Sequence, residues 1–168
     1  MLTDNEILQK RAIKTAIKPK VITETNKDLF AFLQFKLIKE EYAIDYNLIT
    51  EVFSLRDITP IPGTPPYIMG VVSRKGRIIC IVNLKILFGI KQTNLTEMNK
   101  VISIRNGDNE FGIVADSIDG ITEIDLSLLS EPPGNIENKE KFLQGVMPNG
   151  LIVINGINLI TNKKLCIE

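Results

Sequence analysis

From residue 29 onward, the apolar residues of this chain recur in short runs that alternate with polar residues or are separated by turns. Such short, periodic runs are typical of β-strands. The pattern predicts strands at Leu29–Leu37, Tyr42–Ile44, Tyr67–Val72, Arg77–Leu84, Val101–Ile104, Glu110–Val114 and Ile121–Ile124, with Leu151–Ile154 and Ile157–Ile160 closing the series. Residues 45–53 fit either a strand or one helical turn.

Prolines and glycines separate these runs. Residues 59–66 hold four prolines, and residues 132–134 read Pro-Pro-Gly. Proline has no N–H to donate to a strand ladder, so both stretches are predicted to be fixed surface loops. The stretch Ser73-Arg74-Lys75-Gly76 has the length and the glycine of a hairpin turn.

The first 28 residues follow a different pattern. Thr3 and Glu6 have the spacing of a capping box, and apolar residues then recur at helical spacing until Pro19. Five basic residues and no acidic one lie between Lys10 and Lys20. We expect an extension over 1–28 with a short basic amphipathic helix, which either docks on an acidic or membrane surface or packs on the protein itself or stays loose.

Two parts of the chain resemble each other in the same order, which predicts a duplication into two similar all-β units. Short strands at this spacing favour small barrels or a sandwich. The matching segments are Glu41–Ile44 with Glu110–Ile113 at an offset of 69, and, at an offset of 75, Tyr67–Val72 with Phe142–Met147, Ile78-Ile79 with Val153-Ile154, and Asn83-Leu84 with Asn158-Leu159.

The amino-acid composition favours strands and excludes several kinds of catalytic and metal site. The 168 residues include 27 Ile and 9 Val but no His, which excludes Ser-His-Asp or Cys-His catalysis and histidine metal sites. Phosphate-binding loops and nucleophile elbows are also absent from the sequence, and Asp116 and Asp119 lack the frame of a calcium loop. We therefore expect a binding module that is not an enzyme and needs no cofactor or metal.

Location and charge add further expectations. Cys80 and Cys166 lie far apart, and the chain has neither a secretion signal nor a run of about 18 apolar residues, so we expect free thiols in the cytoplasm and no membrane insertion. Residues 71–105 carry seven basic side chains and one acidic, whereas residues 106–140 carry nine acidic and one basic. The molecule then has a positive and a negative side, unless folding mixes these charges.

Several motifs, in order and at their usual spacing, resemble the CheW-like domain family of chemotaxis. They are Glu41–Asp45 followed by Ile49–Val52, Pro65–Val72 followed by Gly76–Ile79, Phe111–Ile118, and Phe142–Val146. The resemblance implies an all-β fold of two SH3-like five-stranded β-barrel subdomains that share a hydrophobic core, with few helices, over residues 29–168.

The same resemblance implies a non-catalytic adaptor that couples chemoreceptors to the histidine kinase CheA. Its partners would be the regulatory domain of CheA and the cytoplasmic tip of methyl-accepting chemotaxis receptors, and it would be a monomer alone but part of a ring or array with them. The alternative is a nucleic-acid-binding small β-barrel protein, against which stand an isoelectric point of 6.4 and the absence of Trp.

By position, the resemblance implies a receptor-binding surface and a segment that could serve either partner. The receptor-binding residues would be Ile49, Gly70, Lys75, Val101, Gly112 and Ile118, with Glu51 and Val52 at the kinase or receptor interface. The family's turn usually reads Asn-Leu-Arg-Gly, so Lys75 replaces an arginine and loses its forked guanidinium. Arg74 could compensate, although neighbouring side chains in a strand point apart.

Overall fold

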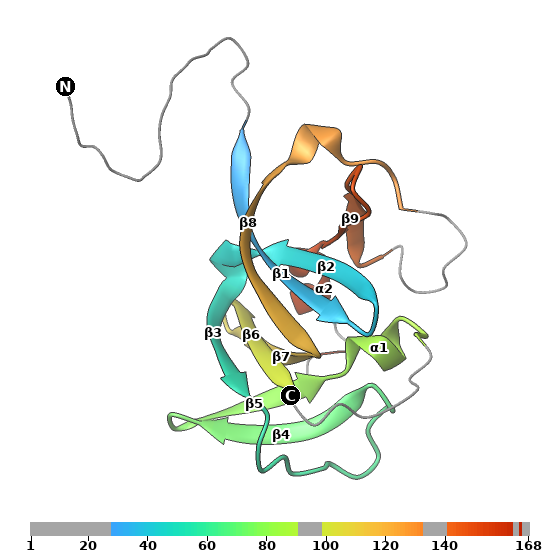
Figure 1. Ribbon diagram of the computed structural model, residues 1–168. Coiled ribbons are helices and arrows are strands. Elements are labelled where there is room, and N and C mark those ends of the chain that lie inside the picture. Colours follow the sequence, from blue (N-terminus) through green and yellow to red (C-terminus); the bar gives the residue numbers. More distant parts are fainter. Residues whose placement is uncertain (1–27, 91–98, 133–140, 163–164, 166–168) are drawn as a thin grey trace, which may run out of the picture.

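The computed structural model describes residues 28–90, 99–132, 141–162 and 165. The expected N-terminal helix, residues 133–134 of the second proline loop, and Cys166 lie outside these residues. The described chain is mostly strand, arranged as two five-stranded sheets with few helices, which confirms the predicted fold of two small barrels. Figure 1 shows one barrel above the other.

The first sheet takes its strands from both ends of the described chain, whereas the second consists of the five consecutive strands between them. The first has the order β8-β1-β2-β10-β9 and the second the order β3-β6-β7-β5-β4. The strands are β1 (Leu29–Leu37), β2 (Glu40–Asp45), β3 (Ile49–Ser54), β4 (Ile68–Arg74), β5 (Arg77–Val82), β6 (Lys100–Asn106), β7 (Asn109–Ala115), β8 (Ser117–Asp125), β9 (Leu143–Val146) and β10 (Ile152–Ile154).

The duplication is confirmed by equivalent strand pairing in the two sheets. β1, β2 and β8 of the first sheet correspond to β6, β7 and β3 of the second at an offset of 69 residues. The equivalent pairs are Leu33–Ile44 and Ile102–Ile113 inside the sheets, and Leu33–Ile121 and Ile102–Val52 at their edges. The sequence repeats are β1–β5 and β6–β10, so each barrel combines two strands of one repeat with three of the other. The mixed colours of the upper barrel in Figure 1 show this exchange.

The predicted register of the later strands is partly wrong. Val153 lies between Gly145 and Ala43, just as Ile81 lies between Gly70 and Gly112. Thus β4 and β9 follow the offset of 75, whereas β5 and β10 follow an offset of 72, because the second hairpin is three residues shorter. The expected matches of Ile78-Ile79 with Val153-Ile154 and of Asn83-Leu84 with Asn158-Leu159 are therefore wrong.

Asparagine caps explain where two predicted strands become helices. β5 ends at Val82, and Asn83 caps the short helix α1 (Leu84–Leu87) by accepting a hydrogen bond from the N–H of Lys85. Asn155 caps α2 (Gly156–Thr161), so the strand expected at residues 157–160 is wrong. An asparagine side chain at this position satisfies an N–H that a helix start leaves free, and the apolar runs that follow fit a buried helix face equally well.

Similar caps resolve the ambiguous segment between β2 and β3. Asp45 accepts a hydrogen bond from the N–H of Asn47 and caps the single turn η2 (Tyr46–Leu48), after which β3 begins. Asp125 does the same for η3 (Leu126–Leu128) after β8. Both expectations for residues 45–53, a helical turn and a strand, are thus partly right. Each turn redirects the chain at the end of a strand.

One apolar cluster lies between the barrels and belongs to both. Phe35, Tyr42 and Ile44 of the first sheet are fully buried in it together with Ile104 and Ile113 of the second. Each barrel also has a smaller interior cluster of its own. The aromatic rings of Phe35, Tyr42, Phe88 and Phe142 follow one another through the shared core at centroid distances of 6.0–6.4 Å. Burial of this surface is the main force that holds the barrels together.

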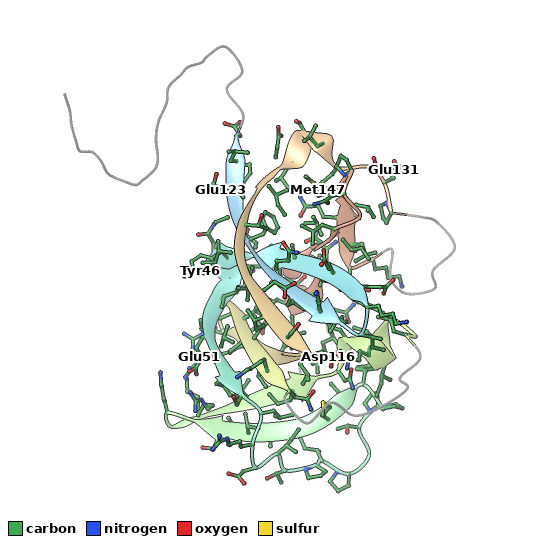
Figure 2. All side chains as sticks on the ribbon, in the orientation of Figure 1. Tyr46, Glu51, Asp116, Glu123, Glu131 and Met147 are labelled. Atoms are coloured by element: carbon green, nitrogen blue, oxygen red, sulfur yellow. The ribbon has the colours of Figure 1, made fainter. Side chains whose placement is uncertain are left out.

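A buried ion pair joins the barrels beside this core. Lys85 of α1 pairs with Asp116, which lies between β7 and β8, and both side chains are almost completely buried. The other carboxylate oxygen of Asp116 accepts a 2.6 Å hydrogen bond from the N–H of Ile38, at the β1–β2 turn of the first barrel. Ile38 has a φ of 60°, which this bond helps to hold. Figure 2 shows Asp116 at this junction.

Removal of the Asp116 carboxylate should destabilise the fold strongly. We expect Asp116→Ala to lower the free energy of unfolding in urea by about 3–5 kcal/mol, because the ammonium of Lys85 is left buried without its partner. Asp119→Ala, which removes an exposed carboxylate of β8, should change the free energy of unfolding by less than about 0.5 kcal/mol. Equal effects of the two variants would contradict this account.

Candidate functional site

The β4–β5 hairpin projects from the second barrel and carries the predicted turn. Arg74 pairs with Arg77 across it, so the loop consists of Lys75 and Gly76 alone. Their φ angles of 50° and 80° are both positive, as in the type I′ turns that suit two-residue hairpins. The predicted hairpin is confirmed. Its geometry leaves the side chain of Lys75 72% exposed at the tip.

Glu51 of β3 faces this hairpin and is held by three cations. Its carboxylate accepts a 2.9 Å hydrogen bond from Nη2 of Arg74 and lies 3.5 Å from Nζ of Lys75 and 3.9 Å from Nη2 of Arg77. β3 and β4 are opposite edges of the sheet, so these contacts span the gap where the barrel closes. The guanidinium of Arg74 also lies 4.4 Å from the ring centre of Phe53. Arg74 therefore provides the close guanidinium contact that Lys75 lacks.

A second carboxylate, Glu110 of β7, continues the cluster. Arg77 donates a short hydrogen bond to it, and Arg105 donates one of 3.2 Å. The hydroxyls of Ser103 and Thr50 donate to its other oxygen at 3.2 and 3.3 Å. Arg77 thereby links the two carboxylates, and all five strands of the second sheet are tied by one network. Sequence reasoning missed Arg77, Arg105 and Glu110, because strand register alone brings them together.

Both carboxylates in the network are ionised over a wide pH range. The hydrogen bond from Arg74 is the largest influence on Glu51 and lowers the pKa of its carboxyl, against the opposing effect of burial. For Glu110, burial raises the pKa, but the hydrogen bonds from Arg77 and Arg105 outweigh it, so the pKa is lowered from 4.5. The carboxylates are only 14% and 10% exposed, whereas the cations around them are exposed by 36% or more. The surface presented to solvent is therefore cationic.

The predicted positive and negative sides of the molecule are only partly present in the folded protein. All described basic residues of the span 71–105 lie in the second barrel, but the acidic span 106–140 is divided between the barrels. Glu110 and Asp116 pair with basic residues of the second barrel. The acidic side chains of β8 and the segment after η3 belong to the first barrel, where Figure 2 shows Glu123 and Glu131. Folding thus both mixes some charges and leaves an acidic strand on one barrel.

Three of the expected receptor-binding residues, Gly70, Val101 and Gly112, form the wall of the second barrel. A single row of paired residues crosses all five strands of this wall and consists of Gly70, Ile81, Gly112, Ser103 and Glu51. A Cβ at Gly70 would lie 2.3 Å from the carbonyl oxygen of Thr59, and one at Gly112 would lie 2.5 Å from a methyl group of Val101. Val101 itself is completely buried. These positions shape the wall that supports Glu51 and are not on the surface.

Ile49 and Ile118 occupy equivalent positions at the edges of the two barrels. Both are partly buried against the shared core, and both pair with a buried core residue. Val52, further along β3, is 42% exposed, and its equivalent Ile121 on β8 is 58% exposed. Sequence reasoning missed Ile121, although its offset of 69 from Val52 could have found it. The two edge strands therefore carry similar apolar side chains.

Other kinds of site find no support in the described residues. Nowhere in residues 28–90, 99–132 or 141–162 do three or more metal-ligating side chains gather. Of the helices in this part of the chain, none is long and apolar enough to cross a membrane. What the described surface offers is a charged cluster, two apolar strand edges and a projecting hairpin, an arrangement suited to protein contacts.

Comparison with known proteins agrees with this class of protein. The CheW-like domain family matches residues 31–162. The chain is 27% identical to the chemotaxis protein CheW of Treponema pallidum over 83% of its length and 87% of that protein, and 32% identical to CheW of Thermotoga maritima over 74% of its length and 82% of that protein. The scaffolding protein TtCheW from Thermoanaerobacter tengcongensis superposes with a TM-score of 0.68 at 26% identity, over 75% of this chain and 88% of that one.

The fold and the surface thus define an adaptor or scaffold, a protein that works through contacts. The chain belongs to the CheW-like domain family of chemotaxis proteins. The match covers both barrels, and the two-barrel fold that the resemblance implies is present.

The charged network makes stability depend on pH in a defined direction. The pKa of Glu110 is lower in the folded protein than in the unfolded chain, so its contribution is present above pH 4.5 and is lost as the pH falls through the folded value. We expect Glu110→Gln to lose less stability than the wild type between pH 7 and pH 3, measured by urea unfolding. Glu123→Gln, at an exposed position, should lose as much free energy of unfolding between pH 7 and pH 3 as the wild type does. An equal loss in the two variants would refute the assignment of this pH dependence to Glu110.

Proposed function

We propose that this protein is a non-catalytic adaptor that couples chemoreceptors to the histidine kinase CheA in the cytoplasm. The match of residues 31–162 to the CheW-like domain, over both barrels, is the observation that carries the proposal. Residues 29–168 act as one domain and residues 1–28 as an extension. The partners are the cytoplasmic tip of the receptors and the regulatory domain of the kinase, and a ring or array forms only with them.

The receptor surface in this proposal centres on β3 and the hairpin. Ile49 and Val52 supply apolar contact, and Lys75 supplies a charge that its 72% exposed side chain can bring to a receptor carboxylate. Arg74 and Glu51 hold the hairpin against β3, so the charge and the apolar edge keep a fixed spacing. Gly70, Val101 and Gly112 act indirectly, through the wall behind them. Ile118 contributes on β8.

Coupling requires that contacts differ between receptor states. An adaptor with equal affinity for both states shifts neither, so the kinase responds only if receptor signalling changes what this surface touches. Two barrels joined by a shared core and by the Lys85–Asp116 pair form a rigid body. Such a body can transmit a shift at one face to a partner bound at another.

An aspartate at Ile49 should weaken receptor binding. The substitution places an unpaired charge in an apolar contact, and we expect at least a tenfold rise in the Kd for a receptor-tip fragment in a titration. Since Ile49 also packs on the core, circular dichroism must show that the variant is folded, and Ile49→Ala provides a milder test. Ile157→Asp, at an exposed isoleucine of α2, is the matched control. Unchanged affinity in a folded Ile49 variant would refute this role.

Reversal of charge at the hairpin tip should separate the two partners. We expect Lys75→Glu to weaken binding of the receptor fragment about fivefold to tenfold, because like charges would meet, and to leave binding of the kinase regulatory domain unchanged. Lys39→Glu, at another exposed turn, controls for net charge. Equal loss of both partners in calorimetric titrations would mean that Lys75 is misassigned.

The nucleic-acid-binding alternative gains nothing from the site. Glu51 and Glu110 neutralise part of the basic hairpin, and Arg74 covers the ring of Phe53 on which a base could stack. A gel shift with single-stranded DNA at low salt would test it directly.

A further inference from the structure

The outer face of the paired strands β1 and β8 leaves apolar side chains of the first barrel uncovered. Side chains alternate along a strand, and Ile124 of β8 lies in the interior cluster of this barrel, so Ile121, Glu123 and Asp125 point to the outer face. Leu29 of β1 pairs with Asp125 and shares that face. The exposed fractions of Ile121 and Leu29 are 58% and 49%. The outer face therefore combines exposed apolar side chains with carboxylates.

The charge of this face is negative and is not balanced by its surroundings on the two strands. Residues 28–35 and 117–125 include four acidic residues, Asp28, Asp119, Glu123 and Asp125, and no basic one. Asp119 and Glu123 are exposed and form no ion pair with any residue that the structure describes. Lys36 lies at the other end of β1 and pairs with Glu41. Figure 2 shows Glu123 beside β1 in the upper barrel. A segment that covers this face must be apolar and basic.

The chain itself carries such a segment before β1. Residues 10–20 include five basic residues and no acidic one. Ile13 and Ile17 recur at helical spacing, and Lys14 and Lys18 follow them directly, so in a helix the lysines flank the isoleucines. A helix of this length is marginal in water by itself and needs a surface for its apolar side. Its pattern is the complement of the outer face of β1 and β8.

The connection to β1 is long enough for this segment to reach the face. Seven residues, 21–27, join the segment to Asp28, and seven extended residues span up to about 23–25 Å. The chain enters the first sheet beside Asp125, and Ile121 lies four residues further along β8, at about 13 Å. A helix over residues 10–20 is about 16 Å long. The segment can therefore fold back and lie along β8.

The same short connection favours docking within one molecule. A short flexible tether holds the segment near its own barrel at an effective concentration of roughly millimolar, well above the concentration of a second copy in dilute solution. Complete burial of an isoleucine side chain contributes about 1.5–3 kcal/mol, so coverage of Ile121 offsets part of the cost of ordering the segment.

We infer that residues 10–20 dock as a basic amphipathic helix on the outer face of β1 and β8 of the same molecule. The isoleucines of the helix pack on Ile121 and Leu29, and its lysines pair with Glu123 and Asp119. This inference goes beyond the coupling function proposed above, since it concerns a segment outside the part of the chain that matches the CheW-like domain.

Hydrogen exchange of the full-length protein, followed by mass spectrometry, tests this docking. We expect the amides of residues 10–20 to exchange at least about tenfold more slowly than in a synthetic peptide of residues 1–27, because a docked helix protects its amides. Asp119→Lys with Glu123→Lys, and separately Lys14→Glu with Lys18→Glu, should each bring the exchange to within about twofold of the peptide. The four changes together should restore the protection, since the charges are then exchanged between the two surfaces.

Matched controls separate docking on β8 from a general effect of charge or stability. Asp108→Lys, at an exposed acidic residue of the second barrel, should leave the exchange of residues 10–20 unchanged. Ile121→Asp should remove the protection, whereas Ile157→Asp on α2 should not.

Several outcomes would overturn the inference. They are exchange in the wild type as fast as in the peptide, protection that survives reversal of the two β8 charges, and an equal loss in Asp108→Lys. Protection that rises with protein concentration would mean that the segment docks on a second copy. Protection that appears only with vesicles of anionic lipid would mean that it docks on a membrane, and either result would also refute docking within one molecule.

Discussion

The exchange of strands between the two sequence repeats is the constraint on which the rest of this structure depends. β3, β4 and β5 of the first repeat join the second sheet, and β8, β9 and β10 of the second repeat join the first. Neither repeat can complete a barrel alone, and the chain crosses the junction between the barrels twice, from β2 to β3 and from β7 to β8. The shared core and the Lys85–Asp116 pair stabilise the same junction. An adaptor built this way holds its surfaces at a fixed angle.

The charged network shows how the fold positions a surface without dedicated chemistry. Glu51 and Glu110 are largely buried and each has basic partners, so the cations face outward at a defined spacing. Arg74 makes the closest contact to Glu51, whereas Lys75, with its ammonium 3.5 Å from the same carboxylate, stays largely exposed at the tip of the hairpin. In this chain Arg74 is the main contact that holds the hairpin to β3, and Lys75 is the most exposed of the three cations around Glu51. This surface therefore presents a partner with side chains at fixed positions and with a positive electrostatic potential.

The duplication also explains why similar features recur on the two barrels. Three pairs of residues occupy equivalent places in the two repeats: Ile49 and Ile118, Val52 and Ile121, and the capping residues Asn83 and Asn155. The repeats have nevertheless diverged in charge, since the β4–β5 hairpin carries Arg74, Lys75 and Arg77 whereas the equivalent residues 143–154 carry no charged side chain. The second barrel also has a groove of its own, lined by Val71, Ile78 and Cys80. Divergence on a common frame gives each barrel its own set of contacts.

The sequence by itself determined the local structure: the β-branched runs, the proline loop at 59–66, a hairpin turn within Ser73–Gly76 and the family motifs all follow from residue type and spacing. It also indicated the duplication. Only the tertiary structure decided which sheet β3 and β8 join. It also decided that residues 157–160 form part of a helix capped by Asn155, and that Val101 is buried whereas Ile121 is exposed. Strand pairing, caps and ion pairs such as Arg77–Glu110 depend on residues far apart in the chain, and local periodicity carries no information about those partners.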